Sequence, residues 1–428
     1  MAQKKIGQMI TRPGRLPSDP PITIPIAEDL LSVPGIPTRP IEVDFYSREY
    51  PIETQNIERS ADREWAMTIL SPEAYAHRKE HEQLNAPLIE AARVTGEIAP
   101  TGTPDPDLDP TELTEMVRGK AREMGFAEVG FTYYNRDYTY LSKKKWARYD
   151  HAICLAMEQD YEATQTIPSM AAEHTHFGVY RVEGKVGLEL ADWIRSLGYH
   201  AQVHSPNDNS AAYIPMFVQA GLGQLGANGQ LLSPHFGSRA RLMIITTDAP
   251  LQYDAPIDYG IHKFCQTCQV CVQRCPARAL MKEKIWYRGA EKNKLIYKRC
   301  RPVMARYLGC GICMKVCPIQ KFGMKAVMEH YVETGEVLGK GTHNLEGYTL
   351  EDKGYFGPGE LPTFDPEVFD MPQGRVEDVL FEDFKEKLMT NRVPEGPEGD
   401  KVLREFAGKV KEFVSSHDER WAKYGEEA

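Results

Sequence analysis

Four cysteines within eleven residues dominate the middle of the sequence. The stretch FCQTCQVCVQRCPARAL places Cys265, Cys268, Cys271 and Cys275 in the spacing C-x2-C-x2-C-x3-C-P. Three cysteines two residues apart can wrap one small inorganic core, whereas a zinc site normally presents two separated C-x2-C pairs. The spacing therefore predicts a [4Fe-4S] site whose fourth cysteine serves a second cluster. Pro276 is expected to begin a helix, where its missing N–H costs nothing.

A second cysteine group follows downstream, as the first one requires. Tyr307 stands where a regular run would place its first cysteine, so we interpret Cys300 as the replacement. Crossing the ligands between the groups predicts two sets of four. The first set is Cys265, Cys268, Cys271 and Cys317, and the second is Cys300, Cys310, Cys313 and Cys275. The alternative interpretation is a pair of zinc sites or structural cysteines.

The composition is that of a soluble protein of two or three domains. The chain has 428 residues, of which 42% are hydrophobic and 26% charged. The ninth cysteine, Cys154, lies in the apolar run HAICLAM, where we expect a buried strand. Thiols committed to metal indicate a reducing compartment. No export signal is recognisable near the start, and no apolar run approaches the ~20 residues that span a bilayer. We therefore expect a cytoplasmic protein without a membrane segment.

Four regions are expected along the chain. Residues 1–105 carry a proline-rich arm and then helices. In residues 106–255, expected strands at AEVGFTYY, HAICLAM and RLMIITT alternate with amphipathic helices, which predicts a layered α/β or α+β sheet domain. The cysteine segment occupies residues 256–325. Residues 326–428 add loops and two closing helices, around Val379 and Phe406.

Two helices of the sheet region have clear signals. Asp109 and Pro110 are expected to cap and begin the first helix. Its buried face is predicted from the helical spacing of Leu113, Met116, Val117 and Met124. The second is predicted from Val186 onward, with an apolar stripe that ends at Gly198.

For three short motifs we prefer a structural interpretation to a functional one. GLGQLG at 221–226 matches the dinucleotide fingerprint, but that fingerprint needs a strand before it and a helix after it. Here the preceding YIPMFVQA looks helical, and the following ANGQLLSP does not. HRKEH at 77–81 matches an inverted zinc-protease motif, yet its surroundings indicate a solvated helix face. HTH at 174–176 is interpreted as packing or surface.

Beyond these motifs, the chain resembles the cobalamin-dependent reductive dehalogenases, which are related to the epoxyqueuosine reductases. The resemblance covers about residues 110–325. It is carried by LADWIRSLGYHA, YIPMFVQAGLGQLGANGQLLSPHFGSRARL, TTDAPL and YGIHKFCQTCQVCVQRCPARA. The displaced Cys300 and the position of Tyr213 favour the dehalogenase branch. The implied fold is α+β, with a nitroreductase-like cobalamin-binding sheet domain followed by a ferredoxin-like domain holding two [4Fe-4S] clusters.

The resemblance also implies the cofactors and the site. The cofactors are a base-off cobalamin, held without a protein ligand to cobalt, and two [4Fe-4S] clusters. A tyrosine assisted by a lysine or arginine donates the proton. Tyr213 is the match, with Lys263 as the preferred cation and Arg239 or Arg241 as alternatives. A nearby cation would lower the pKa of the tyrosine from about 10. The implied cofactor-binding residues are Asn209, Ser210, Gly221, Leu222, Gly223, Gly226, Asn228 and His235.

The implied activity is replacement of a carbon–halogen bond by carbon–hydrogen in an organohalide. The electrons would come from an external donor such as ferredoxin or flavodoxin. The net charge of −10 and the lack of a basic stripe give no support for a nucleic-acid partner. Two alternatives stay open: an epoxyqueuosine-reductase-like deoxygenase acting on tRNA, and a non-catalytic corrinoid or electron-transfer protein.

Overall fold

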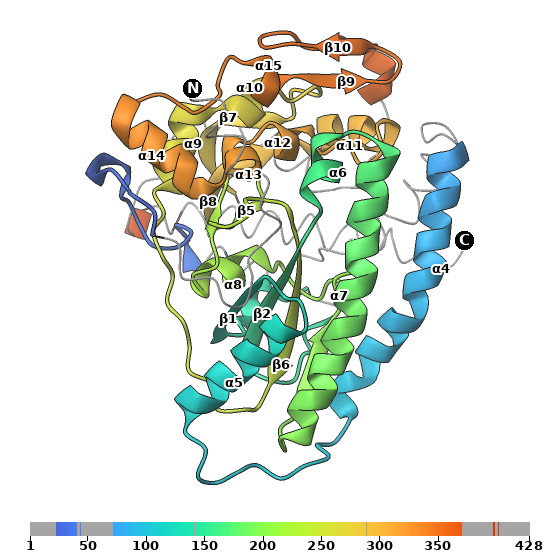
Figure 1. Ribbon diagram of the computed structural model, residues 1–428, viewed down its shortest axis with the longest axis vertical. Coiled ribbons are helices and arrows are strands. Elements are labelled where there is room, and N and C mark those ends of the chain that lie inside the picture. The colour runs from blue at the N-terminus through green and yellow to red at the C-terminus, as the bar shows by residue number, and fades with distance from the viewer. Residues whose placement is uncertain are drawn as a thin grey trace.

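The computed structural model describes five stretches of the chain and two isolated residues. These are residues 23–40, 43, 72–140, 143–287, 289–369, 397–398 and 401. Figure 1 shows a sheet with helices below and the cysteine-bearing helices above it, joined by one long helix that spans both parts. The two closing helices expected around Val379 and Phe406 lie outside the described residues.

A four-stranded antiparallel sheet organises the lower part, in the order β1-β2-β6-β3. The three predicted strands are confirmed, and the antiparallel pairing makes the fold α+β. Their bounds are Glu128–Tyr133 for β1, His151–Glu158 for β2, Ala201–His204 for β3 and Ala240–Thr247 for β6. Cys154 is fully buried in β2, as expected.

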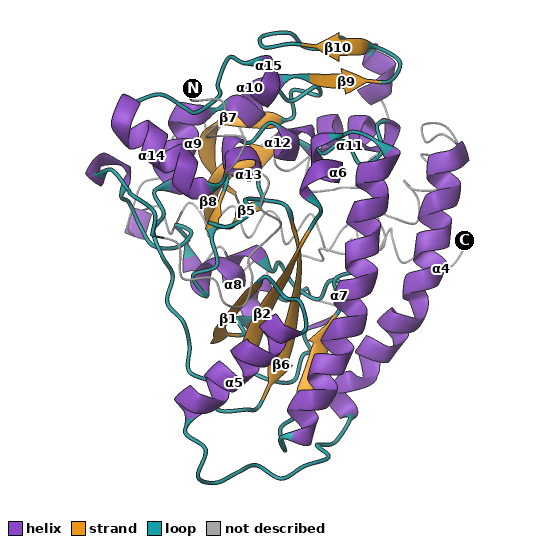
Figure 2. Cartoon of the chain, viewed as in Figure 1, coloured by secondary structure: helices purple, strands orange, loops and turns teal. Residues whose placement is uncertain are grey.

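The two faces of the sheet are covered differently, because side chains alternate along each strand. On β2, Ile153, Leu155 and Met157 pack with α5 (Pro110–Glu123) and α7 (Met170–Ser196). Ala152, Cys154 and Ala156 face the other way, toward α8 (Ile214–Gln219). The long helix α4 (Pro72–Val94) lies along α7 (Figure 2).

The predicted cap at the start of α5 and the predicted end of α7 are confirmed. Asp109 caps α5 by accepting from the Thr111 amide at 2.7 Å, and Gly198 closes α7 with a φ of +96°. Met116 was placed wrongly, since its side chain is 42% exposed. The second helix also begins much earlier than predicted, at Met170 rather than near Val186.

The cysteine-bearing part is built from short helices and one hairpin around its own core. Strands β7 (Leu280–Tyr287) and β8 (Ala290–Leu295) form the hairpin. The helices are α6 (Tyr161–Gln165), α9 (Ile261–Cys268), α10 (Val270–Gln273), α11 (Tyr297–Arg306), α12 (Ile312–Lys315), α13 (Pro318–Phe322), α14 (Met324–Thr334) and α15 (His343–Glu346). Smaller pieces are η1 (Glu28–Leu30), η2 (Thr95–Glu97), η3 (Arg136–Tyr138), η5 (Pro366–Phe369) and strands β4 (Gln224–Leu225), β5 (Leu231–Leu232), β9 (Tyr348–Leu350) and β10 (Gly354–Phe356).

The N-terminal arm lies on this second core over the residues that the structure describes. Ile24 and Ile26 pack against it, and the arm pairs with the hairpin through Thr38 and Ala290. None of the described helices has the length and apolarity required to cross a bilayer.

His204 provides a pH test of the sheet domain. It is fully buried at the end of β3, where its ring contacts the hydroxyls of Ser210 and Thr246 at 2.5 and 3.0 Å. Burial, and then Lys143 and Arg136, lower its pKa to about 3. Because the folded pKa lies below the unfolded value of about 6.5, this residue costs stability as the pH falls from about 6.5 toward 3.

We expect His204→Gln to weaken the pH dependence of the free energy of unfolding below about pH 6.5. Measured by urea unfolding, the free energy of unfolding of the variant should fall less steeply below pH 6.5, by up to about 1.4 kcal/mol per pH unit. His200→Gln, which changes an exposed histidine paired with Asp248, is the control. Identical slopes for wild type and His204→Gln would contradict the prediction.

Candidate functional site

The first cysteine group surrounds a hollow next to the GLGQLG loop. Cys265 and Cys268 lie on α9, Cys271 on α10, and Cys317 immediately before α13. Electrostatic interactions join Cys271 to the other three. The hollow between them is also lined by Ala227 and Asn228 of the loop.

The second cysteine group adjoins the first. Cys313 interacts electrostatically with Cys310, Cys300 and Cys275. It also interacts with Cys317 of the first group, so the two groups are neighbours. All four cysteines of the first group are buried, whereas Cys300, Cys310 and Cys313 are half-buried.

The loops that carry the thiols turn sharply. Gln269, between α9 and α10, and Cys310, before α12, both have positive φ, at 55° and 53°. Pro318 begins α13 as a first-turn proline. Pro276 does not begin a helix, contrary to our expectation: it lies in a turn closed by the Arg278 amide on the Cys275 carbonyl at 3.0 Å.

In both groups, burial and the neighbouring cysteines make the ionised thiolate form unfavourable. Burial first, and then repulsion between neighbouring thiolates, raise the pKa of Cys271 and of Cys313 well above the usual range. Four thiolates can therefore share such a site only with a compensating positive charge. Within the described residues, no three His, Cys, Asp or Glu side chains converge as they would on a single metal ion. A four-iron cluster differs because its four cysteines bind four separate iron atoms.

The glycines of the GLGQLG loop serve the turn itself. A side chain at Gly221 would meet the Ala255 carbonyl at 2.6 Å, and one at Gly223 would meet the Leu232 carbonyl at 2.4 Å. Gly226 is similarly closed off by Asn228 and Leu232. Their need for glycine is thus explained by the chain's own backbone rather than by a ligand. Leu222 is buried in the core beneath α8. No strand precedes the loop and no helix follows it, so the dinucleotide fingerprint is absent there.

Tyr213 lies in a closed network at the start of α8. Its hydroxyl donates to the Ser205 carbonyl at 3.4 Å and accepts from the Ser210 amide at 3.3 Å. Burial is the main cause that raises the pKa of Tyr213, and no cation is among the groups that shift it. The expected lowering of this pKa by a nearby cation is therefore wrong. The neighbouring Asn209 is exposed.

Lys263 does not approach this network. Its amine is exposed and donates to the Asp29 carbonyl, in η1, at 3.1 Å. The structure thus does not bring Lys263, the preferred cation, together with Tyr213, the preferred proton donor. Of the two alternative cations, Arg239 immediately precedes β6 and Arg241 lies near its start.

Arg239 and Arg241 each face a tyrosine, with different surroundings. Arg239 forms a buried ion pair with Glu158 and donates to the Gln159 carbonyl at 2.8 Å, with its guanidinium 5.1 Å from the Tyr161 ring centre. Arg241 lies 4.4 Å from the ring centre of Tyr180 on α7. The flipped side-chain amide of Gln159 would accept from Arg241 Nε at 2.9 Å.

Tyr180 belongs to a stripe of titratable residues on α7 that the sequence analysis missed. Within the described chain, the Tyr180 hydroxyl has no hydrogen-bond partner. One turn earlier, His176 is buried with its Nε2 unpaired, and one turn later Glu183 is fully buried with both carboxylate oxygens unpaired. Burial raises the pKa of Glu183 well above its usual range, although the charge of Arg241 opposes this. Burial is also the main cause that lowers the pKa of His176.

Unpaired buried polar atoms continue from this stripe toward the first cysteine group. Ser238 Oγ, Arg239 Nε and both polar atoms of the Gln320 side chain have no partner among the described residues. Gly237 lets this loop approach α13, because a side chain there would meet Gln320 Cα at 2.6 Å. Buried polar atoms are normally hydrogen-bonded, so this interior region between the sheet and Cys317 can bond ordered water or a polar ligand.

His235 adds an oriented imidazole to the same loop. Its Nδ1 contacts the carboxylate of the buried Glu128, which also accepts from Ser233 Oγ at 2.6 Å. Its Nε2 is buried and unpaired. The carboxylate therefore fixes the ring and leaves one nitrogen available to a ligand.

Several known proteins are similar to this chain. No protein-family model matches the chain. The tetrachloroethene reductive dehalogenase of Desulfitobacterium hafniense is 39% identical over 132 residues, which are 31% of this chain and 24% of that protein. The tetrachloroethene reductive dehalogenase of Sulfurospirillum multivorans is 29% identical over 273 residues, covering 52% of this chain and 54% of the relative. An epoxyqueuosine reductase is a further relative.

A solved structure shares the fold over most of the chain. It was described as a reductive dehalogenase structure that suggests a mechanism for B12-dependent dehalogenation. It superposes with a TM-score of 0.56 at 20% identity, over 92% of this chain and 58% of that one. The chain thus spans about a quarter to about half of the curated relatives that it matches and more than half of the solved one. By these comparisons, the chain is similar in sequence to reductive dehalogenases over part of their length, and it shares the fold of a solved one.

Proposed function

We propose that the protein is a reductive dehalogenase, which uses two electrons and one proton to convert a carbon–halogen bond into a carbon–hydrogen bond and a halide ion. The observation that carries this is the pairing of Arg241 with Tyr180 beside buried polar atoms that lack a protein partner. The pair offers a proton and a compensating charge, and the cysteine groups lie beyond the same interior. The activities of the relatives supply the reaction class.

In this proposal, residues 106–255 form the nitroreductase-like cobalamin domain and residues 256–325 the ferredoxin-like domain. The described residues before 106 and after 325 would cover them. Two [4Fe-4S] clusters occupy the two cysteine groups and pass single electrons. The first group is the nearer one to the site, since Cys317 lies three residues before the unpaired Gln320.

Iron analysis tests the ligand assignment. Anaerobically reconstituted protein should contain about eight irons per chain, as two four-iron clusters. Cys300→Ala removes one ligand of the second cluster, so we expect its iron content and its EPR signal to fall by about half. Cys154→Ala, which changes the buried cysteine of β2, is the matched control and should keep the full iron content. Unchanged iron in Cys300→Ala would remove Cys300 from the ligand set.

The buried residues fit a cobalamin in the interior region. The unpaired Ser238 hydroxyl, Gln320 amide and His235 Nε2 can bond the polar amide groups at the rim of a corrin. Asn228 borders the first cysteine group and is retained from the expected set, whereas the loop glycines act through the turn that positions it. A bound base-off cobalamin would supply a strongly nucleophilic cobalt centre after reduction.

In this proposal, side chains of the protein supply the proton that is added to the carbon. Tyr180 Oη donates it to the carbon that loses halide, and the positive charge of Arg241 stabilises the phenolate that remains. Arg241 is itself oriented by the Gln159 amide and by the His176 carbonyl at 3.5 Å. Glu183 sits one turn from Tyr180, and burial favours its neutral form, so its carboxyl holds a proton close to the pair.

The function is tested by anaerobic reconstitution with iron, sulfide and cobalamin, followed by a halide-release assay with chlorinated and brominated aromatic and aliphatic compounds. Release of halide with consumption of two electrons per bond supports the proposal. Binding of a tRNA that weakens with salt, together with reduction of an epoxide, would instead indicate the deoxygenase. Retention of cobalamin without turnover of any halide or epoxide would indicate a non-catalytic corrinoid protein.

A further inference from the structure

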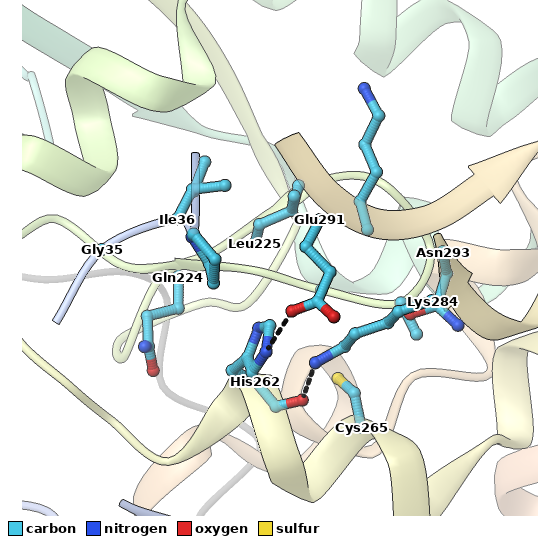
Figure 3. Close-up of a pocket in the computed structure, with 13 residues that line it drawn as sticks. Gly35, Ile36, Gln224, Leu225, His262, Cys265, Lys284, Glu291 and Asn293 are labelled. Atoms are coloured by element: carbon cyan, nitrogen blue, oxygen red, sulfur yellow. Dashed lines mark hydrogen bonds and ion pairs between the residues drawn. The ribbon is translucent and has the colours of Figure 1, made fainter. Parts of the chain in front are cut away.

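A second pocket borders Cys265. Its walls come from the hairpin β7–β8, from α9, from the GLGQLG loop and from the N-terminal arm. Figure 3 shows the Lys284 side chain running across the pocket, with its amine beside the sulfur of Cys265. The residues that line it include His262, Cys265, Lys284, Glu291 and Lys292.

The amine of Lys284 is held in place from two directions. It donates to the His262 carbonyl, on the same helix turn as Cys265. It also interacts electrostatically with the thiol of Cys265 and with Glu291. Glu291 in turn lies 3.4 Å from His262 Nε2. Lys284 is half-buried, so its charge is screened less than that of a surface lysine.

We propose that Lys284 sets the reduction potential of the iron–sulfur cluster held by the first cysteine group. The inference rests on the cluster assignment proposed above. Reduction adds one negative charge to a cluster, and net charge near the cluster is one of the determinants of its potential. A fixed cation beside Cys265 stabilises the reduced form and raises the potential. Lys284 is therefore a positioning residue for electron flow rather than a catalytic residue.

Other cations near this group are placed differently. Lys340 donates to the Cys268 carbonyl at 2.7 Å, but its side chain is exposed and its field is screened by solvent. Lys292 lines the same pocket as Lys284, yet its amine lies 5.3 Å from the centre of the Tyr287 ring and is not among the groups that shift Cys265. Lys292 thus provides a matched control on the same hairpin.

The test is an EPR-monitored redox titration of the reconstituted protein. At a fixed solution potential, Lys284→Met should lower the ratio of reduced to oxidised first cluster by roughly tenfold, which equals a shift of about 59 mV for one electron. The second cluster serves as the internal reference and should keep its potential. Lys292→Met should move neither cluster. Lys284→Arg should restore most of the loss, and Glu291→Gln should move the first cluster in the opposite direction.

The outcomes separate this inference from the function it rests on. An unchanged first-cluster potential in Lys284→Met overturns it. So does a raised potential, because that would be the effect of water entering the pocket rather than of a lost charge. If Lys284→Met loses iron, the first-cluster potentials of Lys284→Arg and Glu291→Gln test the inference instead. The direction of the potential shift in Glu291→Gln depends only on the loss of a negative charge. Wild-type protein that holds no cluster on the first group would overturn the ligand assignment itself, whatever its dehalogenase activity.

Discussion

Tyr180→Phe is expected to lower the rate of halide release by about 10²–10⁴-fold, the usual worth of general acid catalysis. The substitution keeps the ring that faces Arg241 and removes only the hydroxyl. Iron and cobalamin content should therefore stay at the wild-type level, and the loss should appear in the chemical step. The measurement is single-turnover halide release from fully loaded protein, compared with wild type under the same reductant.

Tyr213→Phe is the matched control, because it removes a hydroxyl from the other buried tyrosine that the sequence suggested. The Tyr213 hydroxyl is engaged by Ser205 and Ser210 within its own loop. Turnover close to wild type is therefore expected. The reverse result, with normal rates for Tyr180→Phe and a large loss for Tyr213→Phe, would return the proton donor to Tyr213.

Arg241→Met tests the partner of Tyr180. It should also reduce halide release, because the phenolate left after donation loses its compensating charge. The losses of the double variant should fall well short of additivity, since both residues serve one proton transfer. Fully additive losses would show that the two side chains act independently.

Local rules were enough to predict the elements of the sheet domain and the cysteine pattern. The apolar runs around Cys154 and Ile244 are buried strands, and Asp109 caps α5 as expected. These predictions depend on neighbours in the sequence, so they do not require knowledge of the tertiary fold. The antiparallel order of the strands and the contact of Cys313 with Cys317 depend on chain crossings, which sequence spacing alone does not determine.

The site was harder to predict because proximity to a motif is not proximity in space. Lys263 is two residues from Cys265, but the helix α9 turns its side chain outward to Asp29. Tyr213 precedes the GLGQLG loop, but its hydroxyl closes a local network. Arg241 is 61 positions from Tyr180, and the two meet only because β6 pairs with β2 beneath α7.

A signal for Tyr180 was nevertheless present in the sequence. His176, Tyr180 and Glu183 follow each other at intervals of four and three residues, and the same spacing continues through Gly187 to Leu190. They therefore extend the apolar stripe of α7 on one helical face. Titratable residues in line with a buried stripe point to a functional interior. Because the helix was predicted to begin near Val186 instead of at Met170, this continuity was not recognised.

Arg239→Met is expected to destabilise the folded protein by about 3–5 kcal/mol, whereas Arg241→Met should be far milder. Arg239 and Glu158 form an ion pair with side chains only 6% and 12% exposed. Removing one member of a buried pair leaves the other charge uncompensated, which is the costly change. Arg241 has no such ion pair among the described residues.

Denaturant midpoints of the two variants, measured on equally loaded protein, check this difference. The double variant Glu158→Gln/Arg239→Met should be less damaged than the sum of its single changes, because it leaves no isolated charge. Arg239→Met with wild-type stability and a selective loss of halide release would contradict the structural role of this arginine and make it the cation that assists the proton donor. Arg239, just before β6, and Arg241, within it, would then exchange roles: Arg239 would act in catalysis beside Tyr161, and Arg241 would stabilise the fold beside Glu183.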